Sequence, residues 1–331
     1  MSNPRAVALY SGGLDSTLAI RVMQEQGVTV EAVNIRTTFR CCKSPAAQLA
    51  AELGVRLTVL SVADEYVNLI RKPSYGYGKG MNPCVDCRIY MATMARKFMQ
   101  EVGACVVITG EILGQRPMSQ KRCDLAIIER QSGLSGRLLR PLCAKLLPPT
   151  IPERDGLVDR ERLYAFHGRG RKPLVNLARQ LGIRRIPPPS TGCSLTEITF
   201  APRVRDLIEC QPDAGRADFE LLSVGRHFRF DRQTKIVVGR NEEENAWIEL
   251  YFARENRDDM ILVRPENFVG PVGLVRGLRV HEASRWAGAV LLQYTRQADP
   301  ANAAVRVLQV NQPEQVFQVQ PLAFDETVET L

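Results

Sequence analysis

The sequence predicts an α/β protein built from an open parallel sheet covered by helices, followed by a second, smaller α+β domain. Two observations predict this architecture. Over the first half of the chain, short β-rich runs alternate with helix-length segments, which is the pattern of βαβ units. From about Phe219 the order of strands and helices changes. With 331 residues, of which 45% are hydrophobic, the chain can bury two separate cores.

Strands are expected in the first half where β-branched and aliphatic residues cluster, at 5–10, 29–35, 56–61 and 104–109. The spacing of apolar residues predicts helices between them, at 15–26, 44–53 and 87–102. Gly27, Gly54 and Gly103 stand just past these helices, at the position where a glycine commonly ends a helix. These endings support the βαβ interpretation.

The remaining chain divides at a stretch rich in proline and arginine. Residues 141–195 predict one helix, 173–181, ended by Gly182, and three successive prolines at 187–189 that hold an extended arm. The second domain is expected to have strands at 227–230, 235–238, 260–263, 305–310 and 315–319, and helices at 242–253 and 279–294. The predicted boundaries are therefore 1–196, a linker over 197–218, and 219–331.

Composition limits the location and the partners of the chain. The N-terminus has no apolar run long enough for a membrane span or a signal peptide, so we expect the cytoplasm and no membrane partner. Nine cysteines are then expected to be thiols, metal ligands or catalytic groups. Residues 1–200 hold 28 Lys and Arg against 16 Asp and Glu, whereas residues 201–331 hold 16 against 20. The basic N-terminal part favours a polyanionic partner such as nucleic acid.

A glycine-containing loop follows the first strand and opens the first helix. It reads Ser11-Gly12-Gly13-Leu14-Asp15-Ser16. Backbone N–H groups at a helix start bind anions, and the two glycines permit close approach of a phosphate. Asp15 is placed to hold Mg²⁺. The alternative is an ordinary strand-to-helix turn, and the Walker pattern is absent because no lysine follows the second glycine.

This SGGLDS segment resembles the signature of the PP-loop ATP pyrophosphatases, which cleave ATP between its α- and β-phosphates. The resemblance implies a Rossmann-like domain of the adenine nucleotide alpha hydrolase type. It also implies that pyrophosphate is held by Ser11, Gly12, Gly13, Asp15 and Ser16. Adenine would then lie at the end of the second strand, near Ile35.

Three cysteines form the second candidate site. Cys84 and Cys87 have CxxC spacing at a predicted helix start, where the helix dipole is expected to lower a thiol pKa. Cys193 lies in Ser190-Thr191-Gly192-Cys193, at the expected edge of the same sheet. Three such thiolates can hold three irons of a [4Fe–4S] cluster and leave the fourth iron open. The alternative for a CxxC pair is a redox pair or chance.

The blocks around these cysteines resemble those of the tRNA 2-thiouridine synthetases, in which two cysteines transfer sulfur. Cys87 and Cys193 match those two positions and are the implied catalytic thiols, together with Asp15 for adenylation. Cys84 stands where that family usually has an aspartate, which makes the chain more similar to the cluster-dependent thiolation enzymes. The persulfide and the cluster mechanisms both stay open.

A third block resembles the tRNA 4-thiouridine synthetases. It comprises Gly110 to Gln115, Ser119-Gln120 and Arg140-Pro141-Leu142, so the resemblance spans residues 5–196. Ligands bind at the carboxyl ends of strands in open α/β sheets. Gly110 and Gln115 are therefore candidate nucleotide contacts, with Arg116 and Lys121 as contacts to nucleotide or RNA phosphates. The alternative is a polar surface loop.

The other polar and cysteine residues give weaker signals. The arginines between Arg154 and Arg185 could contact an RNA backbone, His167 could touch RNA, and Tyr164 with Phe166 could stack on bases. A solvated loop balanced by acidic neighbours is the alternative. Cys41 and Cys42 are expected to be ordinary thiols or a sulfur relay. Core thiols are expected at Cys105, Cys123, Cys143 and Cys210.

Residues 238–245, Val-Gly-Arg-Asn-Glu-Glu-Glu-Asn, resemble the RNA-binding module of NFACT proteins. The resemblance implies RNA contacts at Arg240, Arg264 and Arg276. A domain that only stabilises or dimerises the protein is the alternative.

Together these motifs predict an enzyme, an ATP-dependent tRNA sulfurtransferase that uses ATP, Mg²⁺ and a sulfur donor. The alternatives are a PP-loop enzyme acting on a small molecule and a non-catalytic, ATP-sensing RNA-binding factor. The modified nucleotide, the sulfur donor and the oligomeric state, a homodimer included, stay open.

Overall fold

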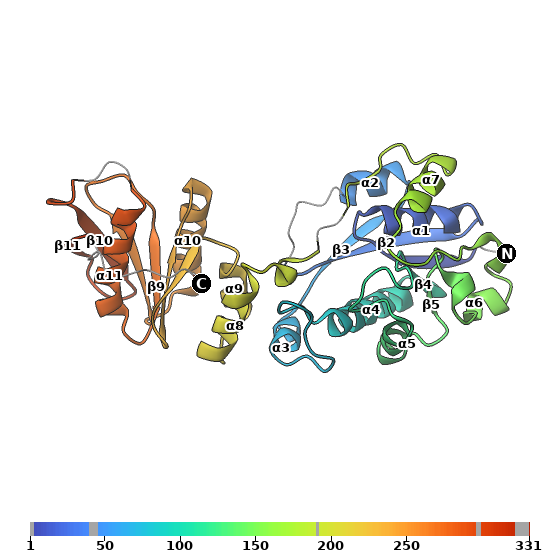
Figure 1. Cartoon of the computed structure of the whole chain (residues 1–331), viewed down its shortest axis with the longest axis horizontal. Coiled ribbons are helices and arrows are strands. Elements are labelled where there is room, and N and C mark those ends of the chain that lie inside the picture. The colour runs from blue at the N-terminus through green and yellow to red at the C-terminus, as the bar shows by residue number, and fades with distance from the viewer. Residues whose placement is uncertain (1–2, 40–45, 190–191, 296–298, 322–330) are drawn as a thin grey trace. The chain divides into compact units, whose positions relative to one another are not determined.

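The computed structural model describes residues 3–39, 46–189, 192–295, 299–321 and 331. The chain forms two compact units, Met1–Thr196 and Glu197–Leu331, whose helices and strands are shown in Figure 1.

The first unit is organised by a parallel sheet with the strand order β3-β2-β1-β4-β5. Its strands are β1 (Arg5–Leu9), β2 (Thr29–Arg36), β3 (Leu57–Ser61), β4 (Val106–Thr109) and β5 (Leu138–Leu139). Strand β1 is central and pairs in parallel with both β2 and β4. The chain builds the sheet in one direction from β1 to β3 and then crosses to β4. The predicted open parallel sheet is thus confirmed, and its topological switch point lies between β1 and β4.

Helices cover both faces of this sheet. They are α1 (Leu14–Gln24), α2 (Ala46–Glu52), α3 (Glu65–Arg71), α4 (Cys84–Glu101), α5 (Arg122–Gln131), α6 (Ile151–Arg154) and α7 (Lys172–Gln180). Short 3-10 turns are η1 (Ala144–Leu146), η2 (Arg160–Arg162) and η3 (Ser194–Thr196). Helices α1, α2 and α7 share one hydrophobic core with the sheet, while α4 packs on the other face and carries α5 (Figure 1).

The predicted strands and helices of this unit are confirmed with small shifts in their ends. Gly27, Gly54 and Gly103 all have positive φ angles, as the predicted helix endings require. The helix expected from Cys87 begins instead at Cys84, after Pro83, so the CxxC pair forms its first turn. Helices α3 and α5 and the two-residue strand β5 were not predicted, because each carries only two or three buried apolar residues.

The second unit contains an antiparallel sheet with the order β11-β10-β8-β9-β7-β6. Its strands are β6 (Arg226–Asp231), β7 (Thr234–Val238), β8 (Met260–Pro265), β9 (Gly273–Gly277), β10 (Ala304–Gln309) and β11 (Gln315–Gln318). Alternate residues of β8 face opposite sides: Ile261 and Val263 pack in one hydrophobic cluster, Met260 and Leu262 in another. Strand β9 was not predicted because glycines flank its three apolar and basic residues.

Helices lie on both sides of the second sheet. They are α8 (Ala201–Cys210), α9 (Arg216–Leu221), α10 (Glu242–Glu255) and α11 (Val280–Gln293). Helix α11 packs on one face, and α10 packs on the other with the end of α9. The segment 197–218, expected to be a linker, is therefore mostly helical and belongs to the second unit. Val204 and Leu207 are buried, which explains why this segment folds onto the sheet.

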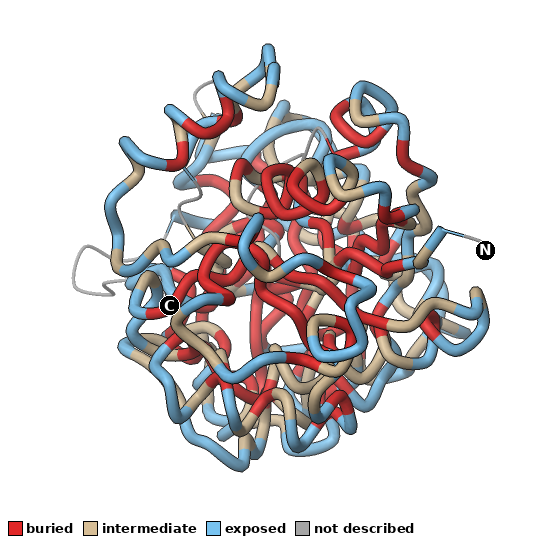
Figure 2. The backbone as a smooth tube through the Cα atoms, turned by 90° about the vertical axis from the view of Figure 1, so that its right-hand side faces the viewer, coloured by how far each residue is buried: buried red, intermediate tan, exposed pale blue. Residues whose placement is uncertain are grey.

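Burial follows the strands and the inner faces of the helices, while the connections are exposed (Figure 2). In β1, for example, Ala6, Val7 and Ala8 are all buried. Burial on both faces is expected of a central parallel strand.

Candidate functional site

The loop between β1 and α1 has the backbone of an anion-binding site. Gly12 has φ +77°, in the left-handed region, and Gly13 precedes the helix in extended conformation. Ser16 Oγ donates to Gly13 O at 3.0 Å and lies 3.3 Å from Ser11 Oγ. The first N–H groups of α1 have no acceptor within the helix, so they point at the space beyond its N-terminus. The segment therefore has the geometry that phosphate binding needs.

The loop after β4 lies directly against the phosphate loop. A Cβ atom at Gly110 would lie 2.4 Å from the backbone of Asp15 and Ser16, so only glycine fits there. Five residues later, Gln115 Nε2 donates to Asp15 Oδ2 at 2.9 Å, across 100 residues of sequence. The two loops meet because β1 and β4 are neighbours at the switch point. Gly110 thus supports the phosphate loop by close packing, while Gln115 holds its carboxylate.

Asp15 lies in a field of positive charge. Burial raises the pKa of its carboxyl group above the usual value, while the Gln115 hydrogen bond, Arg116 and Arg171 act in the opposite direction. A carboxylate held between cations and helix N–H groups suits a metal-bound phosphate chain. Ile35 is buried near the carboxyl end of β2, opposite Leu60 of β3, and β2 itself pairs with β1.

The two cysteines of the CxxC motif have separate hydrogen-bond partners. Cys84 Sγ accepts from Asn82 Nδ2 at 3.2 Å, and Cys87 Sγ lies 3.2 Å from the hydroxyl of Tyr66 in α3. Tyr66 is 2% exposed, and its ring contacts those of Phe39 and Tyr90. The Tyr66 hydroxyl is thus fixed by its surroundings and directed at the Cys87 sulfur.

Cys193 approaches the same region from the far end of the first unit. Thr196 donates to Cys193 O through both its backbone N–H and its hydroxyl. Met81 N donates to Leu195 O at 3.0 Å, which joins this turn to the chain just before α4. Electrostatic influences of Cys87 and Cys193 both raise the pKa of Tyr66, after burial as the largest cause. The structure thus brings Cys84, Cys87 and Cys193 into one neighbourhood.

Arg116 connects the thiols with the phosphate loop. Desolvation is the largest cause that lowers its pKa, followed by Arg88, while Cys84, Asp15 and Cys193 act in the opposite direction. Its backbone N–H donates to Gln120 Oε1 at 3.1 Å, which closes the loop after β4. One short loop therefore carries two of these residues. Its Gln115 bonds to Asp15, and its Arg116 interacts electrostatically with Asp15 and with the thiols of Cys84 and Cys193.

One expectation about the cysteines is not met, and a second gains no support. Burial raises the pKa of Cys87, with the Tyr66 hydrogen bond acting in the opposite direction, so the predicted lowering at the helix start is wrong. Among the described residues, which include Cys84, Cys87 and Cys193, no group of three His, Cys, Asp or Glu side chains could hold a metal ion. The thiols have separate partners in Asn82 and Tyr66 instead of converging on one point. Ser190, Thr191, Cys41 and Cys42 lie outside the described residues.

Tyr66 and Asn82 are the functional-site residues that the sequence interpretation missed. Asn82 directly precedes the proline and cysteine of the motif, but the motif alone gave it no role. Tyr66 belongs to no motif, and the spacing of Tyr66, Val67 and Ile70 would only have predicted a buried helix face. Its approach to Cys87 depends on the packing of α3 beside α4.

The basic segment reaches the phosphate loop at one end. His167 pairs with Leu113 in a short parallel bridge, and its ring lies against Gly114. Arg171 donates to Pro187 O and acts electrostatically on Asp15, whereas Arg169 and Lys172 are exposed. The rings of Tyr164 and Phe166 stack on each other, with 5.1 Å between ring centres, and are half-buried against the core; their stacking on RNA bases stays a prediction.

The remaining candidates behave as follows. Of the four predicted core thiols, Cys143 is buried, and burial raises its pKa to about 11. Cys105 and Cys210 are half-buried. Cys123 is exposed, so the prediction is wrong for this residue. Lys121 is exposed at the start of α5. Arg140, within the Arg-Pro-Leu block, forms a buried ion pair with Glu111 at 3.0 Å and is structural.

The three arginines expected to contact RNA in the second unit are all ion-paired. Arg240 pairs with Glu244 and Arg264 with Glu249, both near the surface. Arg276 is buried against Asp218, which contradicts its predicted role as an RNA contact.

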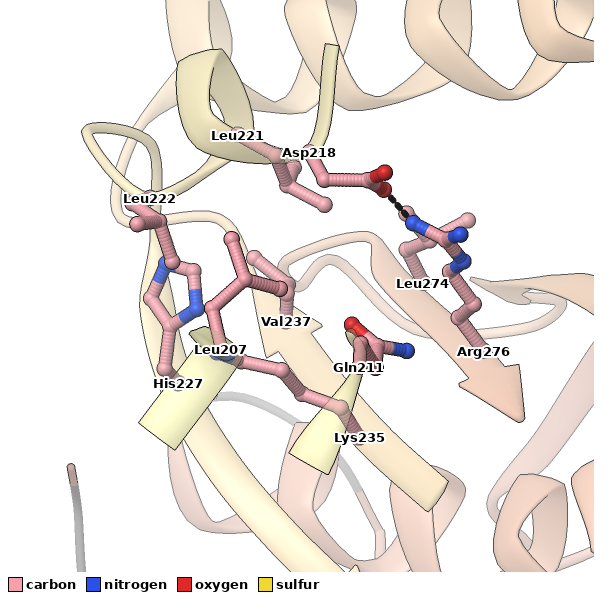
Figure 3. Close-up of a pocket in the computed structure, with 10 residues that line it drawn as sticks. All are labelled: Leu207, Gln211, Asp218, Leu221, Leu222, His227, Lys235, Val237, Leu274 and Arg276. Carbon is pink, nitrogen blue, oxygen red and sulfur yellow. Dashed lines mark ion pairs between the residues drawn. The ribbon is translucent and has the colours of Figure 1, made fainter. Parts of the chain in front are cut away.

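The Arg276–Asp218 ion pair closes one side of a small cavity under α8 and α9 (Figure 3). His227 and Lys235 line it as well, but its volume of about 10 Å³ admits one water molecule at most. The polar groups there fasten the two helices to the sheet and form no ligand site.

Within the described ranges, the chain has no helix that is both long and apolar enough to cross a membrane.

Comparison with known proteins divides the chain in the same way. Residues 1–145 match the family model described as thiamine biosynthesis protein (ThiI). Residues 225–330 match the NFACT protein RNA binding domain. Both resemblances expected from the motifs are thus confirmed.

Among curated proteins, the chain is 31% identical over 122 residues to the tRNA-specific 2-thiouridylase MnmA of Acidithiobacillus ferrooxidans, covering 33% of this chain and 34% of that one. It is 30% identical over 142 residues to the protein named "Probable tRNA sulfurtransferase" of Thermococcus kodakarensis, covering 42% and 36%. The chain therefore spans about a third of the length of these relatives.

A solved complex of a 4-thiouridine synthetase with RNA and ATP is 23% identical, covers 54% of this chain and 41% of that chain, and has a TM-score of 0.38. The chain thus joins a domain that matches the ThiI family model to a domain that matches the NFACT RNA-binding model.

Proposed function

We propose that this protein is an ATP-dependent tRNA sulfurtransferase, which adenylates a pyrimidine carbonyl of tRNA and replaces its oxygen with sulfur. The observation that carries the proposal is the loop after β4. Its Gln115 donates to Asp15 of the phosphate loop, while Arg116 lies in the field of Asp15 and of Cys84 and Cys193. Adenylation and sulfur delivery would therefore share one site at the switch point of the sheet.

The names of the matching relatives support this assignment. They are described as acting in tRNA thiolation, and the second unit matches an RNA-binding domain. Because each relative is matched over about a third of its length, the activity, the tRNA substrate and the sulfur donor of this chain are proposals. Its free thiols suit the reducing cytoplasm, where we expect it to act.

In the first step, the N–H groups of the phosphate loop and the hydroxyls of Ser11 and Ser16 bind the pyrophosphate part of ATP. Adenine lies near Ile35. The carbonyl oxygen of an unstacked tRNA base attacks the α-phosphate, so that pyrophosphate leaves and the base carries an adenylate. Asp15, with its carboxylate held by Gln115, would bind Mg²⁺, which supplies charge neutralisation to the phosphates.

In the second step, sulfur replaces the adenylated oxygen. Cys87 first accepts the outer sulfur of a persulfide donor, which leaves as a thiol. The resulting persulfide on Cys87 attacks the base carbon, AMP leaves, and a disulfide joins the base sulfur to Cys87. The Cys193 thiolate then attacks the Cys87 sulfur, which releases the thiolated base and leaves a Cys87–Cys193 disulfide. An external reductant restores both thiols, and the roles of the two cysteines could be exchanged.

The [4Fe–4S] cluster predicted from Cys84, Cys87 and Cys193 stays a prediction, and no step above passes through it. Its test is iron and sulfide analysis of anaerobically purified protein. About four irons that disappear in each single Cys→Ala variant, but remain in Cys105→Ala, would support the cluster. An iron-free protein that thiolates tRNA would establish the persulfide route.

The test of the function is reconstitution. Purified protein, unmodified tRNA, Mg·ATP and a persulfide donor should yield AMP, pyrophosphate and a thiolated nucleoside detected by mass spectrometry. Cys193→Ala should still release pyrophosphate but accumulate no free thiolated tRNA. Turnover of ATP without tRNA, on a small molecule, would favour the small-molecule enzyme, to which the description "thiamine biosynthesis" also points. RNA binding without AMP release would indicate a non-catalytic factor.

A further inference from the structure

A groove opens on the second unit between the start of α11 and the β10–β11 hairpin. Six of the side chains that line it are His281, Arg285, Gln309, Gln312, Gln315 and Phe317. Its volume of about 120 Å³ has room for several water molecules. One planar heterocycle can replace such a group of waters.

The groove combines an aromatic ring with a cation. Phe317 is half-buried in the edge strand β11 and packs against the core beneath α11. The guanidinium of Arg285 lies 5.7 Å from the centre of the Phe317 ring. Among the described residues, no carboxylate lies within ion-pair distance of Arg285, unlike Arg279 and Arg306 nearby. The charge of Arg285 is thus available to a ligand.

Amide side chains supply hydrogen-bonding groups at the rim. Gln312 and Gln315 are exposed at the hairpin turn, whose Asn311 has φ +57°. Gln309, the last residue of β10, donates from Nε2 to Asp258 O at 2.8 Å, and this bond holds its side chain in place. An amide offers both donors and acceptors, as the edge of a nucleobase requires. This set of side chains matches the requirements of one unpaired base and one phosphate.

We propose that this groove binds a single unpaired nucleobase of an RNA ligand. The base stacks on Phe317, its edge meets Gln312 and Gln315, and an adjoining phosphate meets Arg285. RNA as the ligand class rests on the proposed function. The second unit has more acidic than basic residues, so general attraction of a polyanion does not provide its affinity. Stacking of a base on Phe317 and a contact of its phosphate with Arg285 do not depend on the net charge of the unit.

The full-length protein, titrated with a labelled single-stranded RNA oligonucleotide and with unmodified tRNA, tests the groove. Phe317→Leu keeps the apolar packing but removes the aromatic face, and should weaken oligonucleotide binding about tenfold. Arg285→Ala should lower the slope of log affinity against log salt by about one. Arg254→Ala removes an equal charge from α10, on the other side of the sheet, and should change neither quantity.

Equal affinities and salt slopes for Phe317→Leu, Arg285→Ala and Arg254→Ala would overturn the proposal. Gln312→Ala, in an exposed turn, should weaken binding without any effect on folding, so the test does not depend on the stability of the Phe317 variant. Photochemical cross-linking of a 4-thiouridine-containing RNA should label the peptide that carries Phe317, and labelling elsewhere only would contradict the groove. These measurements read RNA binding directly. A wild-type protein that binds RNA here but thiolates nothing would refute the proposed function and leave the groove intact.

Discussion

Tyr66 gives the Cys87 thiol a fixed hydrogen-bond partner that belongs to no sequence motif. Its hydroxyl lies 3.2 Å from Cys87 Sγ, and this hydrogen bond lowers the pKa of a thiol that burial otherwise raises. A donor in this position favours the thiolate and would orient a persulfide on the same sulfur. Tyr66 is therefore a positioning residue for the sulfur step.

We predict that Tyr66→Phe raises the pKa of Cys87 by about one pH unit, the order expected when a charged group is deprived of a hydrogen bond. The pH profile of Cys87 alkylation, followed by mass spectrometry of its peptide, measures this shift. Pyrophosphate release should be unchanged while tRNA thiolation falls. Tyr90→Phe removes a hydroxyl that accepts from Ala63 N and is the control. Identical alkylation profiles in the two variants would show that Tyr66 only fills space.

Asp15 is the only carboxylate within the phosphate loop sequence, so its charge is not replaced by a neighbour. Asp15→Asn keeps the shape of the side chain and removes the charge. We expect pyrophosphate release to fall about 100-fold, in the range seen when one electrostatic interaction with a reacting group is removed. Thermal unfolding should be close to that of the wild type. Undiminished release would place the metal and phosphates elsewhere.

At the scale of elements, the loop after β4 acts as a support for the loop after β1. Gly110 touches the backbone of Asp15 and Ser16, and a backbone cannot move aside as a long side chain does. Gly110→Ala should therefore displace the phosphate loop and lower the adenylation rate about 100-fold. Calorimetric titration with ATP and pyrophosphate assays measure both effects. Gly170→Ala, where the nearest atom is 3.9 Å away, should change neither.

The basic segment is the second element with a testable role. Arg169 and Lys172 are exposed, whereas Arg171 is half-buried and acts on Asp15. The double variant Arg169→Ala/Lys172→Ala should weaken tRNA binding and flatten its salt dependence by about one unit for each phosphate that is no longer neutralised. ATP binding should be retained. The exposed residues Lys97 and Arg130 provide a control pair of equal charge, and an equal decrease in that pair would show that only net charge matters.

At the scale of the whole molecule, the second unit contains a buried lysine whose charge destabilises the fold. Burial lowers the pKa of Lys235 to about 8 from its ordinary value of 10.5, against the attraction of Asp206. The unfolded chain thus binds more protons between pH 8 and 10.5, so the free energy of unfolding rises with pH through this window. The rise is at most about 1.4 kcal/mol per pH unit.

Both tryptophans, Trp247 and Trp286, lie in the second unit, so urea unfolding followed by tryptophan fluorescence reports on that unit. The difference in unfolding free energy between Lys235→Met and the wild type should shrink as the pH rises from about 8 to about 10. A difference that stays constant over this range would mean that Lys235 has an ordinary pKa.

The local sequence determined the parts of this protein whose physics is local. Strand, glycine turn and helix follow one another in SGGLDS, so the phosphate loop could be predicted from steric freedom at Gly12 and the N–H groups of α1. The ends of helices at Gly27 and Gly103 were predictable for the same reason. The CxxC pair at the start of α4 was also predictable, within three residues.

Only the tertiary structure decided what these local features meet. Gln115 reaches Asp15 because β4 lies beside β1, and strand order is a property of the whole sheet. Tyr66 meets Cys87 because α3 packs beside α4, and the burial created there reverses the expected direction of the thiol pKa. Arg276 was expected at the surface but lies beneath α8 and α9, whose residues as far as Asp218 were expected to form a linker. Periodicity within a segment does not encode contacts between distant segments or the desolvation that follows from them.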